Sequence, residues 1–461
     1  MNAFLALLVL AQIQISVNVR VTRDHSPVSD ALVIARDAAG NEWEARTDEQ
    51  GQARLLVPPG EYQFEARYDR EWRGRGFGRA AVVIGATLEV NIAIEGAREA
   101  MAESAPEPVQ SIPPPPPITI TRQPPYAVVR VHFATDRALS GYTNPAARFN
   151  GDREPGERLR LGVSEVSIPR NHKIGALEEA SIFRLELTDD PTKHVVILKT
   201  TLQKATDFYR DFGKSEAIVF IHGYANTFSD AVRRAAQIKY DLAFDGPIVA
   251  YTWPSRGTLE GYPADVQNVE WTAPHLQSFL QTLAQKSGSH AIHVIAHSMG
   301  TRVLGQAIKS LANVPNAPTF NQIVLAAPDI DASIFKRDIA PAMKKISKHV
   351  TLYASSNDQA LIASKKVHGY PRAGDSGAGI VTVDGIETID VTDVDTSLLG
   401  HSYVGENRTI LSDLYCALRG LPQAIKRCGL QRQGGHWRFA RALAETGALS
   451  TYECDAATCT Q

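Results

Sequence analysis

An abrupt change of pattern at a serine constrains the fold of this chain more than any other feature. Residues 291–296 form a short apolar run, and Ala-His-Ser-Met-Gly at 296–300 then leads into a helical pattern. A serine at such a strand-to-helix corner adopts a strained backbone conformation that presents its Oγ at the end of a sheet. We therefore predict that Ser298 is a nucleophile. The apolar residues of the helix repeat at the spacing of one helical face, and they are Val303, Leu304, Ala307, Ile308 and Leu311.

The residues around Ser298 meet the steric demands of this corner. The side chains two positions before and after the serine have to be small, since larger ones would collide with the neighbouring strand and helix. Ala296 and Gly300 occupy these positions. Glycine is more usual at the first, and we interpret Ala296 as a tolerated variant. A buried strand followed by a helix that Ser298 caps would give the same local pattern, so the interpretation depends on partner residues elsewhere.

A second apolar strand, at 217–221, ends in His222-Gly223 and precedes a helix whose Thr227 and Asp230 have the spacing of a capping box. When a serine attacks a carbonyl, two backbone N–H groups have to face the oxygen that becomes negative. We predict that one is the N–H of Met299 and that the other comes from Tyr224 or Ala225, because a turn after an early strand is a usual place for it.

Two aspartates compete for the acid that would orient a catalytic histidine. Asp358 follows the apolar strand at 349–355, and Asp329 follows the preceding strand at 323–327. Catalytic groups collect at the carboxyl ends of strands in open α/β sheets. We favour Asp358, because the strand directly after the nucleophile usually leads into a structural turn. Asp329 remains the alternative.

Three histidines follow Asp358 in the sequence. His401 comes after a predicted strand at 385–392 and a loop, and before a helix with Ile410, Leu411, Leu414 and Leu418. This setting favours His401 as the general base. His368 is only ten residues beyond Asp358, and His436 lies in a short polar tail. We assign packing and hydrogen-bonding roles to His222 and His297.

These residues predict acyl chemistry without a metal or cofactor. Ser298 would attack an acyl carbonyl, His401 would take and return the proton, and Asp358 would hold the imidazole in the right tautomer. Asp390, Asp393 and Asp395 form an acidic cluster, but their spacing lacks the glycine and terminal glutamate of a Ca²⁺ loop. A solvated loop is the better interpretation of that cluster.

Several segments together resemble a family of bacterial α/β-hydrolases of largely uncharacterised substrate, grouped with esterase- and lipase-like enzymes. The resemblance extends from about residue 127 to 420 and implies a serine hydrolase fold. It does not supply a substrate. The similar segments are 131–137 (VHFATDR), 162–169 (GVSEVSIP) with His172 and Gly175, 220–228 (FIHGYANTF), 231–235 (AVRRA), 253–257 (WPSRG), 296–300 (AHSMG), 327–331 (APDID) and 357–358 (ND).

The N-terminal part has a different pattern. From residue 14 to 97 apolar and polar residues alternate, as at Val17, Val19 and Val21, which predicts half-buried strands. Residues 47–62 resemble the small β-sandwiches of the carboxypeptidase-regulatory, transthyretin-like kind, and such modules support or bind rather than catalyse. Residues 98–125 include five consecutive prolines at 113–117 and predict a stiff linker.

The two ends of the chain bear on its location. Residues 1–13 contain an apolar stretch that is too short to span a bilayer and that we interpret as a possible signal segment, although no Lys or Arg precedes it. A first strand is the alternative. The last 46 residues hold all four cysteines, Cys416, Cys428, Cys454 and Cys459. An even set suggests two disulfides and therefore a periplasmic or secreted protein, and a cytoplasmic protein with four thiols is the alternative.

We therefore predict an α/β-hydrolase fold with a mostly parallel sheet at 126–420, a β-sandwich before it and a cysteine-containing tail at 421–461. The expected activity is hydrolysis of carboxylic esters. Amide or thioester cleavage, acyl transfer to another acceptor, and a non-catalytic scaffold remain alternatives. Tyr224, Trp253 and Tyr262 are candidates for the acyl pocket. The net charge of −2 gives no case for nucleic acid, no transmembrane span is expected, and the sandwich is a possible protein-contact module.

Overall fold

The chain forms two compact units in the computed structural model, and each is described by itself. The first contains the strands between Ile15 and Gly96, and the second contains the described residues from 125 onward. The predicted signal segment, the proline-rich linker, His401, Asp395, Cys454 and Cys459 lie outside the described residues. The structure describes residues 15–23, 26–36, 42–57, 60–68, 72–80, 87–93, 95–96, 125–180, 189–394, 407–421 and 423–439.

The first unit is a small all-β sandwich. One sheet has the order β2-β1-β5, with β8 pairing β1, and the other has the order β4-β3-β6-β7-β9. Val17, Val19 and Val21 of β1 share one buried cluster with Val33 of β3 and Phe64 of β6, so the two sheets pack face to face. The alternation predicted for β1 is confirmed. The strands are β1 (Ile15–Arg23), β2 (Ser26–Pro27), β3 (Leu32–Arg36), β4 (Glu42–Arg46), β5 (Gln52–Val57), β6 (Gly60–Tyr68), β7 (Trp72–Ala80), β8 (Thr87–Ala93) and β9 (Glu95–Gly96).

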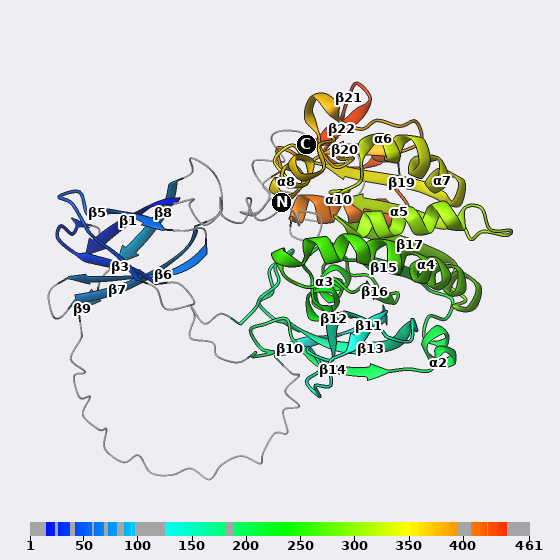
Figure 1. Cartoon of the computed structure of the whole chain (residues 1–461), viewed down its shortest axis with the longest axis horizontal. Helices are drawn as coiled ribbons and strands as arrows, with labels where there is room; N and C mark the ends of the chain where they lie inside the picture. The colour runs from blue at the N-terminus through cyan, green and yellow to red at the C-terminus, as the bar shows by residue number, and fades with distance from the viewer. Residues whose placement is uncertain are drawn as a thin grey trace, which may run out of the picture. The chain divides into compact units, whose positions relative to one another are not determined.

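The second unit is built on one eleven-stranded sheet with the order β14-β13-β10-β16-β15-β17-β18-β19-β20-β22-β21 (Figure 1). Neighbouring strands from β10 to β22 run parallel, which confirms the predicted α/β fold. β11 and β12 form a separate pair. The strands are β10 (Tyr126–Thr135), β11 (Arg137–Leu139), β12 (Phe149–Arg153), β13 (Arg160–Pro169), β14 (Ile197–Leu202), β15 (Glu216–Ile221), β16 (Ile248–Thr252), β17 (Ala291–His297), β18 (Phe320–Ala326), β19 (Ser347–Ala354), β20 (Glu387–Asp390), β21 (Leu430–Gln433) and β22 (His436–Phe439).

Helices cover both faces of this sheet. One buried cluster joins the sheet to α2, α4, α5 and α7, and the other joins it to α3, α8 and α10. Parallel neighbours need crossover connections, and these helices supply them. The helices are α2 (Ala205–Arg210), α3 (Phe228–Asp241), α4 (Tyr262–Lys286), α5 (Gly300–Leu311), α6 (Ala332–Ile334), α7 (Ala340–Ile346), α8 (Gln359–His368) and α10 (Arg408–Leu418).

The strand order places a crevice at the centre of the sheet. From β15 the chain crosses to β16 on one side, and from β16 it crosses back to β17 on the other side of β15. Ligands of open α/β sheets bind outside the carboxyl ends of strands at such a reversal of direction. The turn after β15 and the corner after β17 are the two segments predicted to carry the chemistry, and the topology brings them together.

The sheet continues past residue 420, which corrects the predicted boundary of the catalytic domain. Residues 430–439 form a hairpin, and β22 pairs in parallel with β20 through Ile389 and Trp437. His436 is therefore in a strand of the sheet and not in a polar tail. Strands at the edge of a sheet are only half buried and can contain mostly polar residues. Such strands are difficult to distinguish from a loop by composition.

Among the helices that the structure describes, none has both the length and the apolar character needed to cross a bilayer. The longest, α4, has 25 residues and carries charged side chains along its length.

Candidate active site

Ser298 lies at the corner between β17 and α5, as predicted. Its backbone has a φ of +50°, in the left-handed region that residues other than glycine rarely adopt. The Ser298 N–H donates to the carbonyl oxygen of Ala326 in β18 at 2.9 Å, and the Ser298 carbonyl accepts from the N–H of Thr301 at 3.0 Å. One bond ties the serine to the sheet and the other begins the helix, so the strained conformation is held from both sides.

The small residues around the serine are required by close approach of the neighbouring turn. A Cβ at Gly300 would lie 2.3 Å from the carbonyl oxygen of His222, and a Cβ at Gly223 would lie 2.9 Å from the Cβ of Ser298. Neither distance is tolerable for a side chain. Ala296 is fully buried in the core, so the alanine variant fits this corner.

The turn at residues 223–226, which we name the oxyanion turn, follows β15 and packs against the corner. Ala225 has a φ of +54°. The N–H of Asn226 donates to Ser255 Oγ at 3.2 Å, and Ser255 Oγ donates to Asp265 Oδ2 at 2.6 Å. Tyr224 and Ala225 remain the two alternatives for the second oxyanion donor.

His222 is a packing residue at the base of this turn. Its ring is fully buried and stacks on Trp253, with centroids 5.1 Å apart and planes 6° from parallel. The Nδ1 atom is 2.8 Å from the carbonyl oxygen of Gly223, so it carries the proton. Burial and the nearby guanidinium of Arg137 lower the pKa of His222 to about 3. The His222 imidazole therefore stays neutral and supports the backbone of the turn through its hydrogen bond, and we assign it no role in proton transfer.

Trp253 is not among the residues that line the cavity beside the Ser298 corner. Its side chain is fully buried, and its Nε1–H donates to the carbonyl oxygen of His222 at 2.8 Å. These contacts hold Trp253 in the core, and its place in an acyl pocket stays a prediction. Tyr224 and Tyr262 differ, since both are partly exposed and their rings meet edge to face at 5.2 Å.

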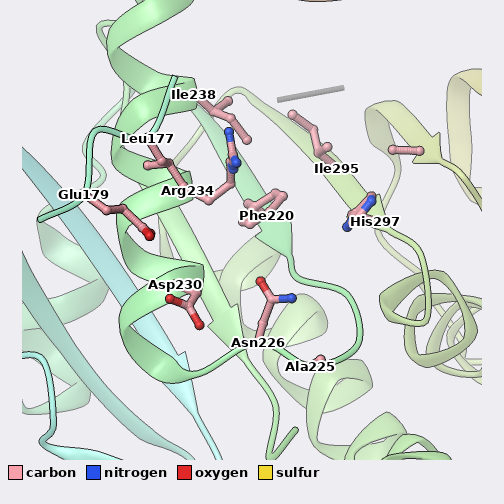
Figure 2. Close-up of a pocket in the computed structure, with 11 residues that line it drawn as sticks. Leu177, Glu179, Phe220, Ala225, Asn226, Asp230, Arg234, Ile238, Ile295 and His297 are labelled. Carbon is pink, nitrogen blue, oxygen red and sulfur yellow. The ribbon is translucent and has the colours of Figure 1, made fainter. Parts of the chain in front are cut away.

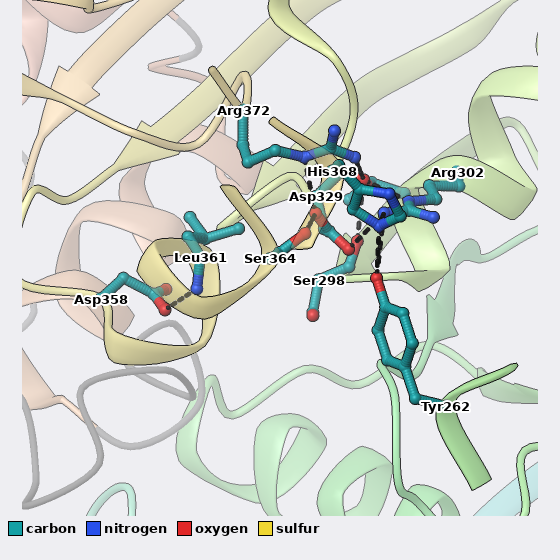
Figure 3. Close-up of polar contacts among 10 residues, drawn as sticks. Tyr262, Ser298, Arg302, Asp329, Asp358, Leu361, Ser364, His368 and Arg372 are labelled. Carbon is teal, nitrogen blue, oxygen red and sulfur yellow. Dashed lines mark hydrogen bonds and ion pairs between the residues drawn. The ribbon is translucent and has the colours of Figure 1, made fainter. Parts of the chain in front are cut away.

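Asp329 lies in an ion cluster (Figure 3). Its Oδ2 accepts from Arg302 Nη2 at 2.8 Å, and its Oδ1 accepts from Arg372 Nε at 2.8 Å and from Ser364 Oγ at 2.5 Å. Both carboxylate oxygens thus hold α5, α8 and the segment of Arg372 together. A carboxylate engaged in this way is poorly placed to orient a further histidine.

His368 belongs to the same cluster. Its Nε2 lies 3.0 Å from Arg302 Nη2 and 2.5 Å from the hydroxyl of Tyr262. A guanidinium can only donate, so this nitrogen is an unprotonated acceptor. Burial, Arg302 and Arg372 lower the pKa of His368. His368 Nε2 is thus engaged by Arg302 and Tyr262, and the preference for His401 as the general base stays a prediction.

Asp358 follows β19 and is the N-cap of α8 (Figure 3). Its side chain is fully buried, and its Oδ1 accepts from the N–H of Leu361 at 3.0 Å. The carboxylate therefore lies at the carboxyl end of a strand that is two places from β17 in the sheet. His401 lies outside the described residues, so its role beside Asp358 and Ser298 stays a prediction.

A cavity of about 180 Å³ lies beside the corner and the oxyanion turn (Figure 2). Its apolar walls come from neighbouring strands and from α3, and its polar rim includes Asp230 and Arg234. Side chains from separate elements form it, which explains why sequence reasoning missed it. The lining residues are Leu177, Glu179, Phe220, Ala225, Asn226, Asp230, Arg234, Ile238, Ile295, His297 and Ala326.

Within the part of the chain that the structure describes, no group of three or more His, Cys, Asp or Glu side chains is arranged to hold a metal ion. Asp390 and Asp393, which the sequence places in an acidic cluster, both pair with Arg438 at 3.9 and 2.5 Å. Asp390 is the last residue of β20 and is buried, so the interpretation of this cluster as a solvated loop is wrong for Asp390.

Residues 200–418 match the model of a family described as "Alpha/beta hydrolase of unknown function (DUF900)". No curated protein matches the chain.

Three solved structures illustrate the structural similarities. A DUF3823 family protein from Parabacteroides merdae is 9% identical over 34% of this chain and 58% of its own length, with a TM-score of 0.15. Lipase B of Aspergillus fumigatus is 14% identical over 47% of this chain and 54% of its own length, with a TM-score of 0.27. The Pyrococcus furiosus esterase Pf2001 is 13% identical over 42% of this chain and 78% of its own length, with a TM-score of 0.25. The chain thus spans little more than half the length of the first two, and these scores carry no argument about its chemistry.

Proposed function

We propose that this chain, whose residues 200–418 match the model of a family of α/β hydrolases of unknown function, is a serine hydrolase that cleaves carboxylic esters. The observation that carries the proposal is the left-handed backbone of Ser298, with a φ of +50° at a strand-to-helix corner. Strain of this kind persists only where the surrounding structure enforces it, and it is characteristic of nucleophile corners.

The proposed reaction has two halves. Ser298 Oγ attacks the acyl carbonyl while His401 takes its proton, and the N–H groups of Tyr224 and Met299 stabilise the oxygen that becomes negative. His401 then protonates the leaving alcohol, and an acyl-enzyme remains. Water, deprotonated by the same histidine, releases the carboxylic acid. Asp358 holds the imidazole and stabilises its charged form.

Two features around the corner support a small acyl substrate. The cavity of about 180 Å³ beside His297 and Ala225 offers apolar walls for part of such a molecule. Tyr224 and Tyr262 are partly exposed, and their rings meet edge to face with centroids 5.2 Å apart. Pockets with mostly apolar walls and a few polar groups are typical of small-molecule sites.

Steady-state kinetics with matched substrates test the proposal. The p-nitrophenyl ester of butyric acid is compared with the anilide and the thioester of the same acid. If the protein is an esterase, kcat/KM should be highest for the ester. The kcat/KM for the anilide should be lower by orders of magnitude. A faster anilide would identify an amidase, and no turnover of any of the three would favour a non-catalytic scaffold.

We also propose that the sandwich is not needed for the chemistry. Its buried cluster runs from Val17 to Ala66 and includes no residue of the second unit. A chain that begins at Tyr126 is expected to hydrolyse a small ester with a kcat/KM within about twofold of the full chain, because independent cores fold independently. The measurement is kcat/KM of both proteins. Lost activity in a shortened protein with native circular dichroism would show that the N-terminal unit completes the site.

The cysteines provide a prediction about compartment. Cys416 and Cys428 are buried, and among the described residues neither is a free thiol. We propose that all four cysteines are paired and that the protein is exported. Each disulfide would contribute about 3 kcal/mol to stability. Mass spectrometry of protein from its native host should find no free thiols and a cleaved N-terminus. Four free thiols with an intact Met1 would indicate a cytoplasmic protein.

A further inference from the structure

We propose that Asp265, together with Ser255 and Arg137, positions the oxyanion turn so that the N–H of Tyr224 faces the reacting carbonyl. These three residues, which we name the turn clamp, come from α4, the loop after β16 and β11. The catalytic part of this inference rests on the proposed function. Its structural part, that the clamp fixes residues 223–226, can be measured without any substrate.

Asp265 supports the oxyanion turn on the side of its N–H groups. It lies in the first turn of α4 and is fully buried. Its carboxylate accepts from Ser255 Oγ at 2.6 Å and from the N–H of Arg256 at 2.8 Å. Ser255 Oγ in turn accepts from the N–H of Asn226 at 3.2 Å. The N–H of Asn226 is thus bound by a hydroxyl group that in turn donates to the carboxylate of Asp265.

Arg137 grips the carbonyl side of the same turn. Its side chain is almost fully buried, and its Nη2 donates to the carbonyl oxygen of Asn226 at 2.7 Å. The Nη1 atom donates to the carbonyl oxygen of Ser255 at 2.8 Å. Nη2 also lies 3.4 Å from the Nε2 of His222, which is an acceptor because its Nδ1 carries the proton. The turn is therefore held by a carboxylate on one side and by a guanidinium on the other.

The backbone of the turn explains why it needs this support. Ala225 has a φ of +54°, and alanine does not adopt this conformation without support from its surroundings. Gly223 lies so close to the corner that a Cβ there would be 2.9 Å from the Cβ of Ser298. A small rotation of the turn would therefore change the position of Tyr224 relative to the nucleophile. Donors to an oxyanion act only within a narrow range of distances.

If Asp265 had a purely structural role, its loss would lower the stability of the fold. It would not selectively raise the free energy of the transition state relative to bound substrate. The two roles are separated by comparing the ground state with the transition state. Loss of an oxyanion donor lowers kcat and leaves KM nearly unchanged, because the charge develops only during reaction. It also weakens binding of a ketone whose adduct with serine carries an oxyanion.

Asp265→Asn is the test variant, because the amide keeps the size of the side chain and places an N–H₂ group where carboxylate oxygen accepts. Asp136→Asn is the matched control. Asp136 is equally buried and also contacts α4, through Thr272 Oγ1 at 2.5 Å and His275 Nδ1 at 2.9 Å. Among the described residues, Asp136 has no hydrogen bond to the oxyanion turn.

For Asp265→Asn we expect kcat on a short activated ester to fall about 100-fold, with KM nearly unchanged. The affinity for an alkyl trifluoromethyl ketone should fall by a similar factor. Ser255→Ala should show the same pattern at about 10-fold, because it removes one link of the network. Asp136→Asn should keep the kcat and the ketone affinity of the original protein.

Hydrogen–deuterium exchange of a peptide that covers residues 221–228 provides the second readout. Exchange should be faster in Asp265→Asn and unchanged in Asp136→Asn. An Asp265→Asn protein with unchanged exchange in this peptide and unchanged kcat would overturn the clamp. If the original protein hydrolysed no ester, the proposed function would fail, and the exchange comparison would still decide whether Asp265 fixes the turn.

Discussion

Ser298→Ala is expected to remove nearly all turnover of a short activated ester. The acyl-enzyme cannot form without Oγ, so only the oxyanion hole and substrate binding would remain. In serine hydrolases with intact surroundings this residual activity is about 10³-fold over water. Stability should change little, since the contacts that hold the corner are made by the backbone of Ser298. The measurement is kcat, with circular dichroism to confirm folding.

Ser412→Ala is the control for this variant. Ser412 lies in α10 and is as buried as Ser298, with 3% and 4% of the residue exposed. It should retain the original kcat. Substantial ester turnover by a folded Ser298→Ala protein would show that another group is the nucleophile.

The second large effect is expected at Asp358. Asp358→Asn should lower kcat by about 10⁴-fold, because an amide can hold the catalytic imidazole in the wrong tautomer. Asp358 also caps α8. Asparagine caps helices as well as aspartate does, so the stability of this variant should change little and the loss should be specific to catalysis. The measurements are kcat and the thermal midpoint.

Asp329→Asn should show the reverse pattern. Its carboxylate pairs with Arg302 and Arg372 at 2.8 Å each, and all three side chains are largely buried. Leaving buried guanidinium groups without their partner typically costs about 3–5 kcal/mol. The variant should therefore unfold at a lower temperature and keep most of its kcat. If Asp329→Asn lost catalysis while Asp358→Asn lost only stability, the assignment of the acid would be wrong.

Local sequence was sufficient for the corner and for most strands around it. The steric demands on Ala296, Ser298 and Gly300 fall within five consecutive residues, so their pattern can be recognised directly. The capping box of α3 is equally local, and the structure has both of its bonds, between Thr227 and Asp230. The parallel sheet followed from apolar runs that alternate with helical patterns.

Contacts between distant segments could not be predicted in this way. Arg137 and Ser255 are 118 residues apart in sequence and meet at the oxyanion turn. Nothing near residues 223–226 indicates that Ser255 and Asp265 support this turn, and the sequence left Tyr224 and Ala225 as equal alternatives. The orientation of Trp253 also depended on tertiary packing, because a residue at the end of a strand can face either the site or the core.

The C-terminal hairpin was missed for a different reason. Its residues 430–439 are mostly polar and contain two glycines, which is also typical of a loop. As strands at the edge of the sheet, β21 and β22 do not need a continuous apolar run. Composition alone therefore did not separate them from a tail.

The central claim is that Ser298 is an activated nucleophile, and reaction with a fluorophosphonate probe tests it most directly. Ser298 Oγ would form a bond to phosphorus and fluoride would leave. We predict a single adduct per chain, found by mass spectrometry on the peptide that contains Ser298 and absent from the Ser298→Ala protein. An unmodified chain under conditions that label known serine hydrolases, or an adduct on another residue, would contradict the account.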